Sequence, residues 1–402
     1  MTVRSGRHFL QIPGPTNVPD RVLRAMDMPT MDHRGPDFAH LARRVLDGIK
    51  PVFKTQGSVI IFPSSGTGAW EAAIVNTLSA GDRVLMFEVG QFSVLWRAMA
   101  ERLGLVLEWV PGDWRHGVSP AEAEARLRAD KDRGIRAVMV VHNETSTGIL
   151  SDVAAIRAAM DRADHPALLM TDAVSSLGSV DYRHDEWRVD VTVAGSQKGL
   201  MLPPGLGFNA VSDKALAQGR ERGGMPRSYW DWGEMIAMNA TGYFPYTPAT
   251  NLLYALREAL DMLAEEGLDR VFARHLRHAA ATRAAVAAWG LGNQCQDRAA
   301  YSPVVTAAIV PEGQSADRMR AVTLERFDMS LGAGLGKVKD RVFRIGHLGH
   351  LNDLSLMGAL SGVEMGLEAA GVPHREGGAR AAMDVLQGAG TAEAEPARQQ
   401  AA

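Results

Sequence analysis

Residues 189–208 read VDVTVAGSQKGLMLPPGLGF, and the organisation of the chain follows from them. The run begins with β-branched residues, which are typical of a short buried strand. A single lysine, Lys198, comes next between Gly195 and Gly199, and the run leaves through a Pro-Pro-Gly turn. The two glycines let the backbone approach a bulky group on either side. A lysine at the end of a buried strand is costly unless a site uses it.

Two roles for Lys198 fit this context. A lysine nitrogen is a nucleophile only when it is neutral, and a crowded, partly desolvated site lowers its pKa toward that state. On this basis we hypothesise that Lys198 forms a Schiff base with pyridoxal phosphate. The alternative is a solvated lysine in a loop between a strand and a helix. The run alone favours neither.

Composition narrows the class of protein. The 402 residues are 46% hydrophobic and 22% charged, with a net charge of −3 and no long basic run, so we expect no nucleic-acid partner. Cys295 is the only cysteine, which excludes an internal disulfide and fits a reducing cytoplasm. The chain has no uncharged apolar run of ~20 residues, and its first residues lack the apolar core of a signal peptide. We expect a cytoplasmic enzyme without a membrane partner.

Strand-like and helix-like runs alternate along the chain. Besides the run above, strands are expected at 58–62, 83–87, 106–110, 137–141 and 167–170. Helices are expected between them at 38–53, 69–78, 94–103 and 153–163, with 90–93 as a loop. This alternation predicts an α/β fold with a mainly parallel, doubly wound sheet in a large domain.

The pattern also predicts the domain limits. Residues 1–19 are an extended N-terminal segment, and 20–265 form the large domain, which becomes loop-rich after Val211. A smaller α+β domain follows over 266–375, with helices at 250–266 and 268–288 near the junction. Residues 376–402 have little to bury and are expected to be disordered.

In sheets of this type, ligands bind beyond the carboxyl ends of the strands. Five candidate side chains come just after predicted strands: Ser65, Phe92, Thr145, Asp172 and Lys198. Their predicted convergence at one edge is the main argument, from the residues alone, for a binding site there.

Pyridoxal phosphate would find a candidate for each of its chemical groups. Residues 65–67 open a helix after a strand, where backbone N–H groups and the helix dipole bind phosphate, although such residues also cap ordinary helices. A buried carboxylate keeps the pyridine nitrogen protonated, which is a role for Asp172; its alternative is a cap for the next turn. Phe92 would cover the ring face, or else lie in the core under a loop.

Two other motifs carry less weight. His347 and His350 lie near each other, but no carboxylate or cysteine is close in the sequence, so structural roles are favoured and no metal is expected. The glycine run 332–336 has the wrong spacing for a dinucleotide fingerprint and precedes no clear helix.

The motifs together resemble the class V aminotransferases of fold type I, in the alanine/serine–glyoxylate aminotransferase group. The resemblance runs from Pro13 to about Ala370 and is closest to bacterial serine–glyoxylate aminotransferases, through 195–206 and 242–248. It rests on PGPTN (13–17), DHR (32–34), SGTG (65–68), HNETSTG (142–148), DAVSS (172–176), GSQKG (195–199) and FRIG (343–346).

The resemblance implies a role for each matching residue. Lys198 would be the Schiff-base lysine and Asp172 the partner of the pyridine nitrogen. The remaining cofactor contacts would come from Val174 and Phe92 on the ring faces, Thr145 on the ring hydroxyl, and Ser65, Gly66, Thr67 and Gln197 on the phosphate. Arg344 would hold the α-carboxylate of the substrate. Tyr243 and Thr247 would reach the phosphate of a second subunit, which implies a homodimer.

The activity implied is transfer of an amino group, expected from L-serine, to glyoxylate, giving glycine and hydroxypyruvate. The alternative donors are aspartate and alanine, and aspartate leads because Arg34 or Arg227 would be able to read its second carboxylate. A cysteine desulfurase needs a mobile cysteine, whereas Cys295 lies outside the motifs. A dinucleotide-binding protein without pyridoxal phosphate is the remaining alternative.

Overall fold

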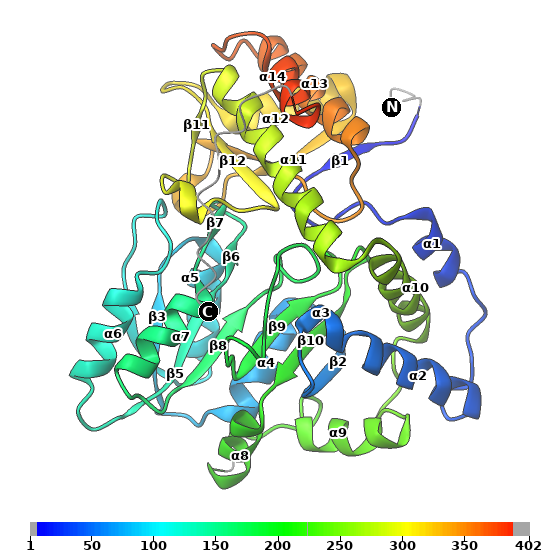
Figure 1. Ribbon diagram of the computed structural model, residues 1–402, viewed down its shortest axis with the longest axis vertical. Helices are drawn as coiled ribbons and strands as arrows, with labels where there is room; N and C mark the ends of the chain where they lie inside the picture. The colour runs from blue at the N-terminus through cyan, green and yellow to red at the C-terminus, as the bar shows by residue number, and fades with distance from the viewer. Residues whose placement is uncertain (1–5, 223, 389–402) are drawn as a thin grey trace.

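The larger of two main sheets contains the strands expected from the sequence. The computed structural model describes residues 6–222 and 224–388, and Figure 1 shows the larger sheet in the lower half of the molecule. Its strand order is β2-β10-β9-β8-β5-β3-β4, and β10 runs antiparallel to both of its neighbours. The bounds are β2 Ser58–Ser64, β3 Arg83–Phe87, β4 Val106–Val110, β5 Ile135–Val141, β8 Leu168–Asp172, β9 Val191–Gly195 and β10 Gly205–Val211.

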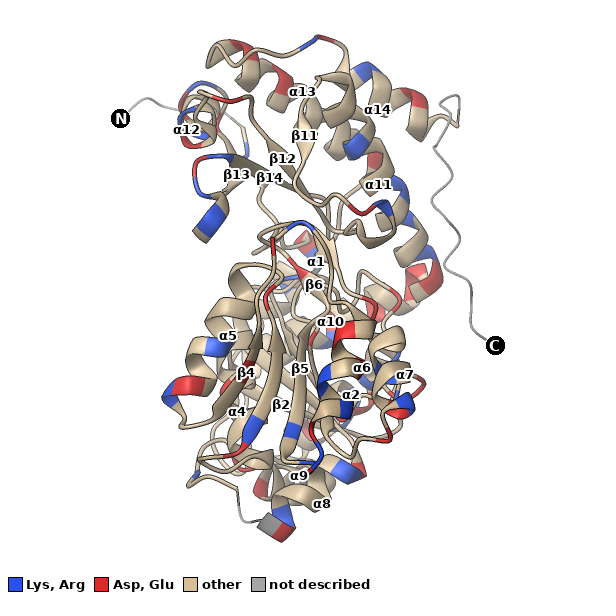
Figure 2. Ribbon diagram, turned by 90° about the vertical axis from the view of Figure 1, so that its left-hand side faces the viewer, with Lys and Arg blue, Asp and Glu red and all other residues tan. Residues whose placement is uncertain are grey.

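The central strands are buried because helices cover both faces of this sheet. Every residue of β8 and β9 is buried, as expected for parallel strands enclosed in this way. Figure 2 shows that most charged residues lie on the surrounding helices and that the strands carry few. The mainly parallel α/β fold predicted from the sequence is confirmed. The helices of this half are α1 Asp20–Met26, α2 Pro36–Gly48, α3 Lys50–Phe53, α4 Gly66–Thr77, α5 Gln91–Arg102, α6 Pro120–Ala129, α7 Val153–Arg162, α8 Asp213–Arg222, α9 Trp232–Thr241 and α10 Thr250–Glu266.

The second sheet has the order β1-β13-β14-β12-β11 and lies in the upper half of Figure 1. Its edge strand β1 comes from the start of the chain, where Phe9 pairs with Met329 in parallel register. Its strands are β1 Phe9–Gln11, β11 Gly292–Asn293, β12 Val305–Ile309, β13 Met329–Ala333 and β14 Val342–Gly346. Its helices are α11 Leu268–Ala288, α12 Ala316–Phe327, α13 Asp353–Ala369 and α14 Gly378–Leu386. The domain limits expected from the sequence stay a prediction.

Three local expectations are wrong. Residues 91–93 start α5 and are not loop, because the Ser93 hydroxyl accepts the Gly90 N–H and Glu144 accepts the first-turn N–H groups. The stretch after Val211 contains α8 and α9. Helix α9 is capped by the Asp231 carboxylate, which accepts the Glu234 N–H at 2.9 Å, and it ends at Gly242 in the left-handed region.

The third correction concerns the expected disordered tail. Residues 378–386 form α14, which packs on α11 and α13 and buries Ala382 completely. Its apolar residues lie on one face, which the low overall hydrophobicity of the tail conceals. Residues 389–402 lie outside the described part of the chain. Among the described residues, no helix combines the length and apolar composition needed to cross a bilayer.

A buried histidine in α11 leads to a prediction about stability. The His275 Nδ1 donates to the Val271 carbonyl at 2.7 Å, and Nε2 accepts the Gly349 N–H at 3.1 Å, so the ring is neutral. Burial, together with the charge of Arg274, lowers the pKa of His275 to about 3. Below pH 6.5 the unfolded chain therefore binds a proton that the folded chain excludes, and stability falls as the pH falls.

We expect His275→Gln to destabilise the protein at pH 7.5 but to flatten this pH dependence. The stability difference between wild type and variant should narrow by about 1.4 kcal/mol per pH unit below about pH 6. Urea denaturation between pH 5 and 8 measures it. His40 is exposed, so His40→Gln is the control and should leave the curve unchanged. A difference that stays constant with pH would contradict the prediction.

Candidate active site

The strand order brings the candidate residues to one edge of the larger sheet. Asp172 is the last residue of β8, and Lys198 lies three residues after β9. Residues 142–150 follow β5 and form a small hairpin, β6 Asn143–Glu144 and β7 Ile149–Leu150. Because β2, β9, β8, β5 and β3 run in the same direction, the segments that follow them lie at the same edge.

Lys198 is buried beneath the N-terminal segment of the chain. Its Nζ donates to the Pro13 carbonyl at 2.6 Å, and the Thr16 hydroxyl donates to the Lys198 carbonyl at 3.2 Å. Gly14 has φ +100°, and a Cβ there would lie 2.5 Å from Nζ. Burial, together with the positive charge of Arg344, lowers the pKa of Lys198 to about 8, while Asp172 opposes the shift. A substantial fraction of the amine is therefore neutral near physiological pH.

Asp172 is a buried carboxylate that has one short hydrogen bond from the backbone. Its Oδ1 accepts the Val174 N–H at 2.7 Å. Burial and the negative charge of Glu144 raise the pKa of Asp172 to about 7, against the lowering effects of that N–H, Trp70 and Lys198. A carboxylate in this state gains strongly from a cationic partner. It serves as a cap for the next turn and still offers an oxygen to a ligand.

An anion site lies where α4 begins. Ser65 is the N-cap residue, but its side chain makes no capping hydrogen bond, so the first N–H groups of the twelve-residue helix are left to a ligand. A Cβ at Gly195 would lie 3.0 Å from Gln197 Oε1 and 3.5 Å from the Gly66 nitrogen, so Gln197 and the helix start face the same small space. Gln197 Oε1 is buried and accepts no hydrogen bond from the described residues.

Three more of the predicted residues lie at this end of the sheet: Val174, Phe92 and Thr145. Val174 lies against Gly66, where a Cβ would come within 2.6 Å of Val174 Cγ2, and Phe92 is half-buried in the first turn of α5. The Thr145 hydroxyl is buried and donates to Ser175 Oγ at 3.4 Å. The described residues therefore bring an amine, a carboxylate, a helix N-terminus and apolar side chains to the same end of the sheet. These groups fit pyridoxal phosphate.

Arg344 reaches this edge from β14 of the second sheet. Its Nη1 donates to the Thr145 carbonyl at 2.9 Å and its Nε to the Ala333 carbonyl at 2.7 Å. Burial lowers the pKa of Arg344 to about 10, opposed by the charge of Glu144. The guanidinium therefore stays charged near neutral pH.

Three residues singled out in the sequence lie elsewhere in this chain. Tyr243 stacks on Phe38 at 6.5 Å between ring centroids, and Thr247 is exposed. Arg227 bonds the Val75 and Met225 carbonyls and pairs with Asp231 at 3.1 Å. Val75 lies near the C-terminal end of α4, at the opposite end of that helix from Gly66. The Arg227 guanidinium is therefore committed to groups at the C-terminal end of α4, away from Gly66.

Sequence reasoning missed Glu144, which is fully buried among the predicted residues. It belongs to the quoted HNETSTG motif, but no role followed from a carboxylate next to Thr145. The only signal was a charged residue directly after a long apolar strand. His347, in contrast, has the structural role expected, because its ring bonds the Thr306 hydroxyl at 2.9 Å and the Pro303 carbonyl at 3.0 Å.

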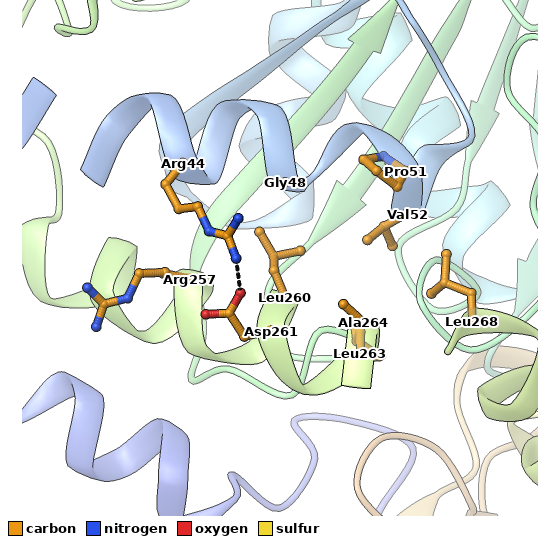
Figure 3. A pocket seen from close by; sticks show the side chains of 10 residues that line it. All are labelled: Arg44, Gly48, Pro51, Val52, Arg257, Leu260, Asp261, Leu263, Ala264 and Leu268. Atoms are coloured by element: carbon orange, nitrogen blue, oxygen red, sulfur yellow. Dashed lines mark hydrogen bonds and ion pairs between the residues drawn. The ribbon is translucent and has the colours of Figure 1, made fainter. Parts of the chain in front are cut away.

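A separate pocket of about 180 Å³ lies between α2, α3 and α10. Figure 3 shows Arg44 paired with Asp261 at its side and apolar side chains over the rest of its wall. None of the residues that line it belongs to the cluster around Lys198, so it plays no part in the site.

Comparison with known proteins gives one consistent family. The profile described as aminotransferase class V matches residues 8–329. The serine–glyoxylate aminotransferase of Methylorubrum extorquens is 50% identical over 95% of this chain and 96% of its own length. The L-aspartate–glyoxylate aminotransferase of Paracoccus denitrificans is 47% identical over 92% and 94%. The crystal structure of ureidoglycine–glyoxylate aminotransferase from Bacillus subtilis superposes with a TM-score of 0.87 at 27% identity, covering 96% of this chain and 100% of that one.

The contact between Gly14 and Lys198 leads to a prediction. We expect Gly14→Ala to displace the lysine side chain, because the added methyl would occupy the position of Nζ and Cε. Labelling of Lys198 by pyridoxal phosphate and borohydride, followed by peptide mapping, should fall at least about tenfold, the effect of about 1.4 kcal/mol.

Gly81 provides a matched control. It also has positive φ, +87°, but a Cβ there would meet nothing within 4 Å. Gly81→Ala therefore carries the same kind of backbone strain, of about 1–2 kcal/mol, without touching Lys198. Equal labelling of Lys198 in both variants would show that Gly14 has no special relation to the lysine.

Proposed function

The chain belongs to the class V aminotransferase family, and from that premise we propose that it transfers the amino group of L-serine to glyoxylate, yielding hydroxypyruvate and glycine. The enzyme uses pyridoxal phosphate. The observation that carries the proposal is the buried amine of Lys198, whose pKa of about 8 is set by burial and by the neighbouring charges of Arg344 and Asp172. An amine of this kind exchanges protons near neutral pH.

The proposed contacts with the cofactor follow from the groups around that amine. When bound, pyridoxal phosphate supplies an electron-accepting ring that lowers the cost of removing the substrate α-proton. Asp172 would pair with the ring nitrogen and keep it protonated, and Lys198 would anchor the cofactor. The other contacts come from Phe92 and Val174 on the ring faces, Thr145 on the ring hydroxyl, and Ser65, Gly66, Thr67 and Gln197 on the phosphate.

Two residues act on the substrate. Within the described residues, Arg344 uses two of its five N–H donors on carbonyl groups, so three remain for the α-carboxylate. A planar guanidinium binds both oxygens of a carboxylate and so orients the α-carbon. Once the amine of the donor has displaced it, the freed Lys198 nitrogen would accept the α-proton of the donor and deliver it to the cofactor. Glyoxylate takes the same site in the second half of a ping-pong cycle.

The choice of serine as the amino donor needs an argument of its own. Serine is supported by the 50% identical relative, but an aspartate enzyme is 47% identical, so overall similarity does not separate them. An aspartate donor needs a second cation. Arg227 is held by Asp231 and two carbonyl groups, which leaves Arg34 as the candidate of that pair. Only one of the two proposed cations is thus left for an aspartate donor.

We also propose a cytoplasmic homodimer. In its own chain Tyr243 packs on Phe38 and Thr247 is exposed, which leaves Thr247 accessible to a second subunit. The cytoplasmic location is supported by Cys295, which is a free, buried thiol.

The donor is tested by steady-state kinetics with glyoxylate and serine, aspartate or alanine. We expect kcat/KM for serine to be at least equal to that for alanine, because a buried hydrogen-bonding group left unpaired by alanine costs about 1–3 kcal/mol. Lys198→Ala should abolish activity with every donor. If kcat/KM for aspartate exceeds kcat/KM for serine by more than about tenfold, or 1.4 kcal/mol, the serine proposal is wrong. Arg34→Ala then tests whether Arg34 reads the second carboxylate.

Sharing of the site is tested with mixed dimers. Lys198→Ala inactivates a chain but leaves its 243–247 segment intact, and a Tyr243→Ala/Thr247→Ala chain keeps its lysine. We expect each to be inactive alone and the mixture to recover activity, because one of the two sites in a mixed dimer is then complete. If no activity returns although mixed dimers form, each chain builds its own site.

A further inference from the structure

The carboxylate of Glu144 holds the start of α5 and the hairpin together. Its Oε2 accepts the backbone N–H groups of Phe92 at 3.0 Å and Ser93 at 3.2 Å. Its Oε1 accepts the N–H of Ser146 at 3.0 Å and the hydroxyl of Ser146 at 2.7 Å. Glu144 is fully buried, and a Cβ at Gly90 would lie 2.5 Å from its Cδ. Burial raises the pKa of Glu144, whereas these four hydrogen bonds and the dipole of α5 favour its ionised form.

Glu144 is also linked to Arg344, through Thr145, which follows it in the chain. The Thr145 carbonyl accepts the Arg344 Nη1 hydrogen at 2.9 Å. The charge of Glu144 counteracts the burial that lowers the pKa of Arg344, and it contributes to the raised pKa of Asp172. Glu144 thus connects Phe92 in helix α5 with Arg344 in strand β14, which belongs to the second sheet.

We propose that Glu144 is a positioning residue that orients Phe92 against the cofactor ring and holds the Thr145 carbonyl in place for Arg344. It touches neither cofactor nor substrate. This inference rests on the proposed function, because it takes Phe92 as the ring-stacking residue and Arg344 as the carboxylate-binding residue.

The arrangement requires a carboxylate and not only a polar side chain of the same size. Four donors converge on two oxygens, and an ionised carboxylate accepts from all of them. A glutamine has one accepting oxygen, and its NH₂ group would face N–H or O–H donors on the other side. Glu144→Gln therefore releases either the first turn of α5 or Ser146.

The experiment compares Glu144→Gln with a matched control, Asp190→Asn. Asp190 is also a buried carboxylate, and it accepts the Leu169 N–H at 2.8 Å and the Ser212 hydroxyl at 2.9 Å. It precedes β9 and so lies at the opposite edge of the sheet. The readouts are the dissociation constant of pyridoxal phosphate from the purified protein and the visible circular dichroism of the bound cofactor, which reports how the ring is held.

We expect Glu144→Gln to weaken pyridoxal phosphate binding about tenfold, since hydrogen bonds to a charged group are lost, and to change the visible circular dichroism band. Asp190→Asn should lower thermal stability and leave both readouts unchanged. Equal dissociation constants and equal bands in wild type and Glu144→Gln would overturn the inference. A wild-type protein that binds no pyridoxal phosphate would instead overturn the proposed function.

A second pair of variants keeps the inference testable if Glu144→Gln folds poorly. Ser146→Ala removes one of the four hydrogen bonds to Glu144 and also the acceptor of the Gln91 N–H at 2.9 Å, so it should shift both readouts in the same direction. In a double-mutant cycle, Glu144→Gln should add little to the loss of cofactor affinity already caused by Phe92→Ala, because both act on one contact. Fully additive losses would show that Glu144 does not act through Phe92.

Discussion

Four buried ionisable groups at one edge of a sheet are the constraint on which the site depends. Arg344 carries positive charge, Lys198 can carry positive charge, and Asp172 and Glu144 can carry negative charge. A single buried charge without partners is strongly unfavourable, so each group needs an opposite charge or several hydrogen bonds. Here the backbone provides much of the compensation. The carbonyl groups of Pro13, Thr145 and Ala333 and the N–H groups at the start of α5 are the partners.

These partners come from both sheets, so the site exists only when the two halves of the molecule are correctly placed. Arg344 belongs to β14, yet it bonds the hairpin of the larger half. Strand β1 is part of the second sheet, and residues 13–16, just beyond it, cover Lys198. Glu88 adds a further link by accepting the Trp114 indole N–H at 2.8 Å and pairing with Lys337. A small shift between the halves would alter the positions of Arg344 and Pro13 together.

Many strands and long helices were predictable because their signals are local, although β10, β13 and the 17-residue α13 were not predicted. The run 83–87 and the helix 250–266 have the bounds that periodicity indicates. The short helices α8, α9 and α14 were not predicted. Their surroundings are rich in glycine, proline or small residues, and their stability comes from caps such as Asp231 and from packing on other helices. Helix propensity, summed over a window of the sequence, takes no account of those long-range contacts.

The sequence by itself determined the α/β alternation, the family, and the positions of the lysine, carboxylate and helix start that follow the strands. Only the tertiary structure decided which backbone groups surround them. The Lys198–Pro13 bond joins residues 185 positions apart, and the Arg344–Thr145 bond joins residues 199 apart. The same contacts assigned Arg227 to a loop near Val75 and revealed Glu144 as the acceptor for α5. Burial and charge act through space, whereas sequence patterns report only neighbours along the chain, so pKa shifts and shared partners required the folded structure.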